Sequence, residues 1–306
     1  RAPGEARYRL ASGRGARLAE HELRMRQPCL VAVNLDAGDG EGLIYQAAAV
    51  DLDRLRRELA DHLHWTEVVG WDAQQEAVVA RREQRLGELM LDSAPLVKPD
   101  PVRLVSAMLD GVRRLGLDAL PWTTEAREWR ARVLSVRAWL PQEAWPDVSD
   151  QALLETLEQW LAPYLGGCTR RAHLARLDLP AALKSLLDWQ QNLRLDELAP
   201  THIGVPSGAR HRLEYVPGQS PVLAVKLQEM FGLADTPRIA GGRVPVTLHL
   251  LSPARRPIQV TQDLHGFWER TYGEVKKELK GRYPRHPWPD DPWNATPTAR
   301  VQRRPK

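Results

Sequence analysis

The strongest chemical signal in the sequence is a run of cations interleaved with flat rings near its end. Between Arg270 and Lys306 there are ten Lys or Arg and four Asp or Glu, an excess of six positive charges against +4 for the whole chain. Cations suit phosphates and ring faces suit bases, the two features that a single-stranded nucleic acid presents. The predicted contact residues are Lys276, Lys277, Lys280, Arg282, Tyr283, Arg285, His286 and Trp288.

A plainer interpretation of this stretch stays open. Lysines in the last turn of a helix also complement its dipole, and Trp268 and Tyr272 fit an apolar stripe that faces a core. Two further arginine groups could grip phosphates. Arg255 and Arg256 lie at a predicted hairpin tip between prolines, and Arg7, Arg14 and Arg17 flank a glycine turn near the other end of the chain. A soluble loop explains the hairpin pair equally well.

Signatures of catalysis are absent from the sequence. It contains no GxxxxGK[ST], GxGxxG, HExxH or GxSxG pattern, so phosphate-cradling loops, dinucleotide binding, zinc proteolysis and the hydrolase elbow lack their motifs. His62 and His64 form a pair without a nearby third ligand, and Asp290 and Asp291 lie between prolines in a predicted solvated turn. We therefore predict no catalytic residue, no metal site and no cofactor within these 306 residues.

The setting of the chain follows from its cysteines and apolar runs. Cys29 and Cys168 are far apart and in no paired spacing, which favours a reducing, cytoplasmic location. The longest uncharged apolar runs fall far short of a membrane span, so we expect no membrane partner. The opening Arg1-Ala2-Pro3-Gly4 has neither an initiator Met nor a hydrophobic leader, and we expect a piece of a longer protein.

The elements that would position these residues predict an α+β protein. Residues 1–97 show short apolar runs broken by turns and one helical stretch, Asp51–His62, which predicts a small closed β-barrel of the OB type. The prolines of Lys98–Pro101 predict a linker. A C-terminal region, 102–306, would follow it.

That C-terminal region divides by its periodicity into three parts. Apolar steps of three and four predict a helical bundle over 102–199, for example in Thr124–Leu140, where Thr123 or Thr124 would be the N-cap. A period of two returns over 200–281 and predicts a β-sheet, followed by a packed helix that begins at Asp263 and stops at Gly281. Residues 282–306 form a basic tail rich in Pro and Trp.

Several segments together resemble the HrpB family of bacterial DEAH-box ATP-dependent RNA helicases. The similarity is carried by Arg256-Pro257-Ile258-Gln259-Val260-Thr261-Gln262-Asp263-Leu264, by Lys280-Gly281-Arg282-Tyr283-Pro284-Arg285-His286-Pro287-Trp288-Pro289-Asp290-Asp291-Pro292, by Leu120-Pro121-Trp122-Thr123, by Pro95-Leu96-Val97-Lys98-Pro99, and by Arg7–Ala16. It covers essentially the whole chain and corresponds to the C-terminal part of family members.

The resemblance implies a helicase core in cis, with RecA-like domains that use ATP and Mg²⁺ and lie before Arg1. It also implies an auxiliary module here that binds single-stranded RNA without sequence preference. The alternative is a structural or protein-interaction module that packs on the core or on a partner. Its distinguishing feature is the tryptophan-rich bundle, which contains Trp122, Trp129, Trp139, Trp145, Trp160 and Trp189.

Overall fold

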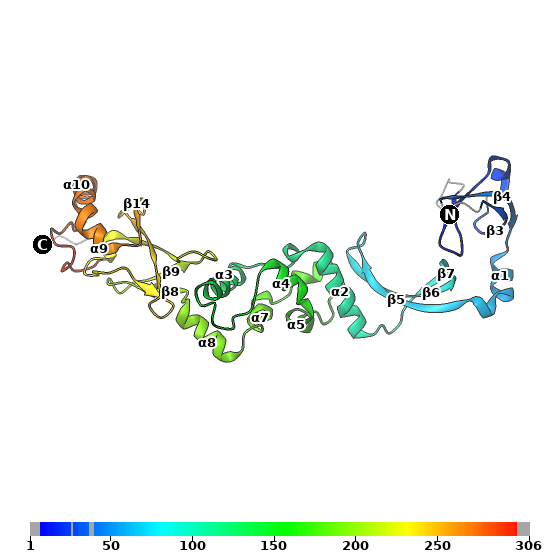
Figure 1. The fold of residues 1–306 in the computed structure, drawn as a ribbon, viewed down its shortest axis with the longest axis horizontal. Helices are drawn as coiled ribbons and strands as arrows, with labels where there is room; N and C mark the ends of the chain where they lie inside the picture. Colours follow the sequence, from blue (N-terminus) through cyan, green and yellow to red (C-terminus); the bar gives the residue numbers. More distant parts are fainter. Residues whose placement is uncertain (1–6, 26, 37–39, 299–306) are drawn as a thin grey trace. The chain divides into compact units, whose positions relative to one another are not determined.

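The computed structural model describes residues 7–25, 27–36 and 40–298 and has the expected α+β character (Figure 1). The chain forms two compact units. The first contains residues up to Leu115 together with Leu165–His173, and the second contains Gly116–Tyr164 and the residues from Leu174 onward. Each is described by itself below. The expected linker at Lys98–Pro101 leads directly into a helix of the first unit, and separate folding on its two sides stays a prediction.

The first unit contains two antiparallel-rich sheets. One has the order β1-β2-β4-β3, and the other has the order β5-β6-β7. Its strands are β1 (Arg7–Arg9), β2 (Gly15–Leu18), β3 (Leu30–Leu35), β4 (Gly42–Ala49), β5 (His64–Asp72), β6 (Ala77–Leu86) and β7 (Leu89–Pro95). Its helices are α1 (Leu52–Glu58), capped by Asp51, and α2 (Pro101–Leu115), which packs on β5 and β6. A buried cluster of Tyr8, Ala16, Leu18 and Ile44 holds the first sheet.

The prediction of a closed barrel is wrong for the described residues. β1 and β3 remain the two edges of an open sheet, and β2 pairs with β4 in parallel, which requires a crossover through β3. β5 and β6 form an antiparallel hairpin with nine residue pairs in unbroken register. The expected hairpin around Asp72–Glu76 is therefore present, but it builds a separate sheet and does not close the first one.

The predicted bundle over 102–199 is divided, because its first helix, α2, belongs to the first unit, and the helix predicted over Thr124–Leu140 is present in the second unit. α3 (Thr124–Trp139) is capped by Thr123, whose hydroxyl accepts from the Ala126 N–H at 3.1 Å. Trp129, Val133 and Val136 lie on its buried side. The remaining helices are α4 (Asp150–Glu155), α5 (Leu157–Trp160), α7 (Leu179–Lys184) and α8 (Trp189–Leu198), while α6 (Arg171–Leu174) lies at the division between the units.

The sheet of the second unit has the order β14-β13-β10-β9-β8. Its strands are β8 (His202–Gly204), β9 (Arg210–Glu214), β10 (Val222–Lys226), β13 (Thr247–Leu251) and β14 (Pro257–Thr261), and a small separate pair consists of β11 (Arg238–Ile239) and β12 (Val244–Pro245). β10 and β13 run parallel. The helix predicted from Asp263 is present as α9 (Leu264–Gly266), a π-turn over Phe267–Thr271, and α10 (Tyr272–Arg282).

Candidate nucleic-acid interface

The basic segment after α10 packs back against that helix. Trp288 is 8% exposed, and its indole N–H donates to the Tyr283 carbonyl at 3.0 Å. The Tyr272 hydroxyl donates to the Pro289 carbonyl at 3.0 Å, while the Tyr272 ring lies edge-on to Phe231. Trp268 and Tyr272 are core residues, as the apolar stripe predicted. Trp288 supports the end of the helix, and its ring is not available to stack on a base in this arrangement.

Lys276 is already engaged within the chain. Its ammonium group donates to the Pro289 carbonyl at 3.0 Å and forms an ion pair with Asp290. The hydrogen bond and the charge of Lys276 lower the pKa of Asp290 below its usual value, so the carboxylate stays charged at neutral pH. Because the pair neutralises Lys276, this residue offers little to a phosphate.

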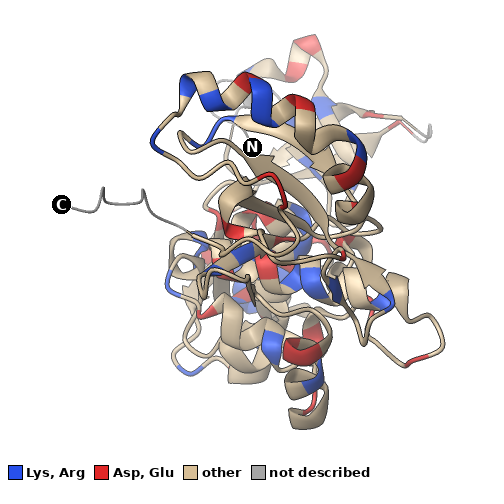
Figure 2. Ribbon diagram, turned by 90° about the vertical axis from the view of Figure 1, so that its left-hand side faces the viewer, with Lys and Arg blue, Asp and Glu red and all other residues tan. Residues whose placement is uncertain are grey.

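Four predicted contact cations remain exposed and form no hydrogen bond or ion pair with another described residue, although the charge of Lys280 acts on Asp290. They are Lys277, Lys280, Arg282 and Arg285, named here the α10 cation cluster. Lys277 and Lys280 are neighbours at a spacing of three on the helix. Glu274 and Glu278 are exposed on the same helix, and Figure 2 shows acidic and basic stretches interspersed over the ribbon. The cluster is thus local to the end of α10.

Two half-buried rings lie beside this cluster. Tyr283 and His286 pack edge to face, with ring centroids 6.2 Å apart. Burial, and after it the charge of Lys226, lowers the pKa of His286, so its ring is neutral at pH 7. Both rings come directly after α10 and are next in sequence to Arg282 and Arg285. The end of the helix therefore combines cations with partly accessible flat rings.

Arg255 and Arg256 occupy the tip of the β13–β14 hairpin, as predicted. The turn is closed by the Ser252 N–H donating to the Arg256 carbonyl and the Arg255 N–H donating to the Ser252 carbonyl, both at 2.8 Å. Arg255 has a φ of 60°, a left-handed conformation that normally belongs to glycine. Both side chains are exposed. An arginine in a position where glycine costs less is typical of a side chain with a function.

The three arginines of the first unit are not equivalent. Arg7 forms an ion pair with Glu41 at 3.0 Å. Arg14 donates to the carbonyls of Gly40 at 2.7 Å and Asp36 at 3.1 Å. Arg17 is exposed and pairs in register with Arg7 across the β1–β2 ladder. Two of the three therefore hold local structure, and only Arg17 is open.

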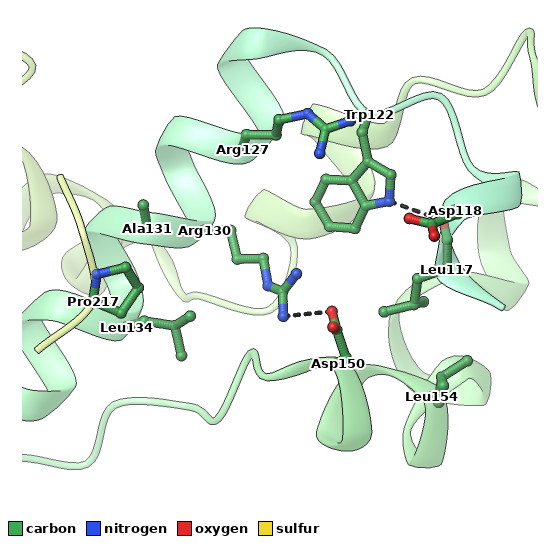
Figure 3. A pocket seen from close by; sticks show the side chains of 10 residues that line it. All are labelled: Leu117, Asp118, Trp122, Arg127, Arg130, Ala131, Leu134, Asp150, Leu154 and Pro217. Atoms are coloured by element: carbon green, nitrogen blue, oxygen red, sulfur yellow. Dashed lines mark hydrogen bonds and ion pairs between the residues drawn. The ribbon is translucent and has the colours of Figure 1, made fainter. Parts of the chain in front are cut away.

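Sequence reasoning missed a cavity of about 610 Å³ beside α3 (Figure 3). The guanidinium groups of Arg127 and Arg130 lie over the Trp122 ring at 5.9 and 5.4 Å from its centroid. Arg127 and Arg130 are one helical turn apart, so they share a face, and this spacing is the signal in the sequence. Trp122 directly precedes the helix, but the contact of its ring with the two guanidinium groups could not be predicted from the sequence.

The described residues also bear on metal binding and on membrane insertion. Within residues 7–25, 27–36 and 40–298, no group of three or more His, Cys, Asp or Glu is arranged to hold a metal ion. Among the helices of that same part of the chain, none is both long and apolar enough to cross a membrane.

Comparison with known proteins gives consistent matches. Residues 160–292 match the family model for the ATP-dependent helicase C-terminal region, and residues 62–96 match the model for the connector region of ATP-dependent RNA helicase HrpB. The chain is 44% identical over 301 residues to ATP-dependent RNA helicase HrpB of Escherichia coli strain K12. That match covers 98% of the chain but 37% of the relative, so the chain spans little more than a third of its length.

Two solved structures are also similar. The crystal structure of the E. coli DExH-box NTPase HrpB matches with a TM-score of 0.67 at 44% identity, covering 98% of this chain and 38% of that one. The crystal structure of the Escherichia coli DEAH/RHA helicase HrpB matches with a TM-score of 0.58 at 40% identity, covering 94% of this chain and 36% of that one. The chain therefore belongs to the HrpB family of ATP-dependent RNA helicases, of which it carries the connector and C-terminal regions.

Proposed function

We propose that this region is a non-catalytic accessory part of an ATP-dependent RNA helicase, and that the α10 cation cluster contacts the backbone of single-stranded RNA. The observation that carries the proposal is the set of four exposed, unpaired cations at the end of a helix whose other side is buried. Leu279 and Tyr272 fix that side to the core. Charges on a rigid support lose little conformational entropy when a strand binds.

The hairpin tip and the half-buried rings add further groups that can bind RNA. Arg255 and Arg256 add two exposed guanidinium groups, each able to bind a phosphate through two hydrogen bonds. Tyr283 and the neutral ring of His286 offer faces to bases, and stacking of this kind tolerates any sequence. The affinity for RNA would therefore depend strongly on the salt concentration and only weakly on the RNA sequence.

The catalytic work would belong to the helicase core in cis. In this proposal the core binds ATP and Mg²⁺ and moves along RNA, while the region described here holds the strand that enters or leaves it. The chain itself lacks the phosphate-cradling motif that nucleotide hydrolysis of this kind requires. Accordingly, the module would alter RNA affinity without turning over nucleotide.

A protein-interaction role is the second candidate, and one observation favours it. Three of the six bundle tryptophans, Trp129, Trp145 and Trp160, are buried in the core. Trp189 differs because it is 74% exposed, and Leu193, one turn further along α8, is also exposed. An exposed Trp is typical of a protein-binding hot spot.

Salt dependence separates the two candidates. We would titrate the chain into fluorescein-labelled single-stranded RNA and follow anisotropy at several salt concentrations. Four phosphate contacts at about 0.7 each predict a slope of log affinity against log salt near −3. Duplex RNA should bind more weakly because its bases cannot stack on the exposed rings. Affinity that does not change with salt would contradict the proposal and favour an apolar interface.

A further inference from the structure

The cavity beside α3 has the size and the walls of a small-ligand site. Its volume of about 610 Å³ lies within the range of about 300 to 1,000 Å³ that is usual for such sites. Leu134 and Pro217 lie at one end of the cavity and Leu154 lies at the other (Figure 3). The rest of the wall contains an indole, two guanidinium groups and two carboxylates. The cavity is therefore partly apolar, with a few polar groups in its wall.

Trp122 is held rigidly in the cavity wall. Its indole N–H donates to the Leu117 carbonyl at 2.9 Å, and the ring is half-buried. Arg130 lies against it and is fixed in turn, because its guanidinium donates to the Val148 carbonyl at 2.6 Å and pairs with Asp150 at 2.7 Å. Ring and guanidinium form a preorganised part of the wall, and Asp150 already neutralises the charge of Arg130.

Arg127 and Asp118 are the polar groups left without partners. The Arg127 side chain is exposed, and apart from its position over Trp122 no contact of its guanidinium is recorded. Asp118 is exposed near the indole N–H edge of Trp122, and no donor to its carboxylate is recorded. A ligand that satisfies both must carry an anion for Arg127, a hydrogen-bond donor for Asp118, and a flat apolar body between them.

From this chemistry we infer that the cavity binds a nucleoside 5′-monophosphate whose base carries an exocyclic amino group. The base packs on the Trp122–Arg130 wall, the amino group donates to Asp118, and Arg127 binds the phosphate through two N–H donors. The ligand is either a free nucleotide or the 5′-phosphorylated end of a strand. The site uses none of the α10 cation cluster and so extends the function beyond that surface.

The test uses the full chain and four small probes in calorimetric titrations. The probes are AMP, UMP, which lacks the exocyclic amino group, ribose 5-phosphate and a phosphotyrosine peptide. AMP should bind saturably and at least fivefold more tightly than UMP or ribose 5-phosphate. The variant Asp118→Ala should remove the preference for AMP over UMP. A 5′-phosphorylated adenosine oligomer that binds tenfold more tightly than the same oligomer with a 5′-hydroxyl would identify a strand end, and equal affinity of the two oligomers would identify a free nucleotide.

Variants of Arg127 show whether binding occurs in this cavity. Arg127→Ala should weaken AMP binding about tenfold or more, and Arg127→Lys should weaken it less because it keeps the charge but loses the planar fork. Arg176→Ala removes an equally exposed arginine elsewhere in the same unit and should change nothing. Far-UV circular dichroism of each variant checks the fold.

Three results would overturn the inference. They are no saturable AMP binding, equal binding of AMP by the Arg127→Ala variant, and tighter binding of ribose 5-phosphate or the phosphotyrosine peptide than of AMP. The double variant Lys277→Ala/Lys280→Ala should leave AMP binding unchanged. Its effect on longer RNA strands tests the proposed strand surface separately, so one idea can fail without the other.

Discussion

At the residue scale, Glu83 is the most constrained charge in the first unit. It lies on the middle strand β6 and is 1% exposed. Arg81 donates to one carboxylate oxygen at 2.6 Å, and Arg85 donates to the other at 2.8 Å. Burial by itself raises the pKa of Glu83, but these hydrogen bonds and the two positive charges outweigh it, and the pKa is lowered overall.

We predict that Glu83→Gln destabilises the first unit at pH 7 by about 1–3 kcal/mol, the value of hydrogen bonds to a charged group. Because the folded pKa lies below the unfolded one, this stabilisation is complete above about pH 4.3 and disappears as the pH falls through the folded pKa. Urea unfolding at several pH values measures it. The free energies of unfolding of wild type and variant should converge in acid, and a difference between them that stays constant with pH would contradict this account. Glu88→Gln, at a more exposed carboxylate, serves as control.

The strained tip residue Arg255 gives a second residue-scale prediction. An L-residue in the left-handed region costs about 1–2 kcal/mol, while glycine costs the unfolded chain about 0.4–1 kcal/mol more in entropy. Arg255→Gly should therefore raise stability by about 0.5–1 kcal/mol and at the same time weaken RNA binding. Arg256→Gly, where φ is not positive, should lower stability. Thermal unfolding together with RNA titration checks both, and unchanged RNA affinity in Arg255→Gly would remove the hairpin tip from the surface.

At the element scale, the packing of α2 on β5 depends on a glycine. A Cβ at Gly111 would lie 2.5 Å from the ring of Trp71, which real contacts essentially never show. Helix propensity favours Ala over Gly by about 0.8–1 kcal/mol, whereas overpacking costs about 1–3 kcal/mol. The steric cost is the larger of the two, so the glycine allows helix and strand to approach closely.

Gly111→Ala should accordingly lower the free energy of unfolding of the first unit by about 1 kcal/mol. Gly273→Ala is the matched control, because Gly273 lies within α10 and a Cβ there meets nothing within 4 Å. It should raise stability by up to about 1 kcal/mol. Urea unfolding followed by circular dichroism distinguishes the two. A stabilising effect of Gly111→Ala would show that α2 and β5 are not packed this closely.

Elements defined by local signals could be predicted from the sequence, and those defined by distant pairing could not. The start of α3 follows from the Thr123 cap and a three-four apolar spacing, both of which lie within one segment. The first sheet was mistaken for a barrel because the parallel pairing of β2 with β4 joins segments that carry no local mark of it. The basic segment is visible in the sequence, but the burial of Trp288 and the pairing of Lys276 depend on tertiary contacts.

At the scale of the whole molecule, RNA binding depends less on the net charge than on where the unpaired charges lie. The chain carries only +4, and several of its arginines, among them Arg81, Arg85 and Arg130, are paired with a carboxylate. Arg300, Arg303, Arg304 and Lys306 belong to the expected basic tail but lie outside the described residues. The α10 cation cluster lies in the last turns of α10 and directly after it, within the described residues, and RNA binding should therefore depend on it.

The salt dependence of single-stranded RNA binding by a cluster variant tests this claim most directly. We would compare wild type with Lys277→Ala/Lys280→Ala/Arg282→Ala and with Arg176→Ala/Arg210→Ala/Arg243→Ala, which loses the same charge at exposed positions in other segments of the second unit. At about 0.7 per phosphate contact, the cluster variant should lose about 2 units of the salt slope, and the control should keep the wild-type slope. Equal slopes and affinities in all three proteins would contradict the account.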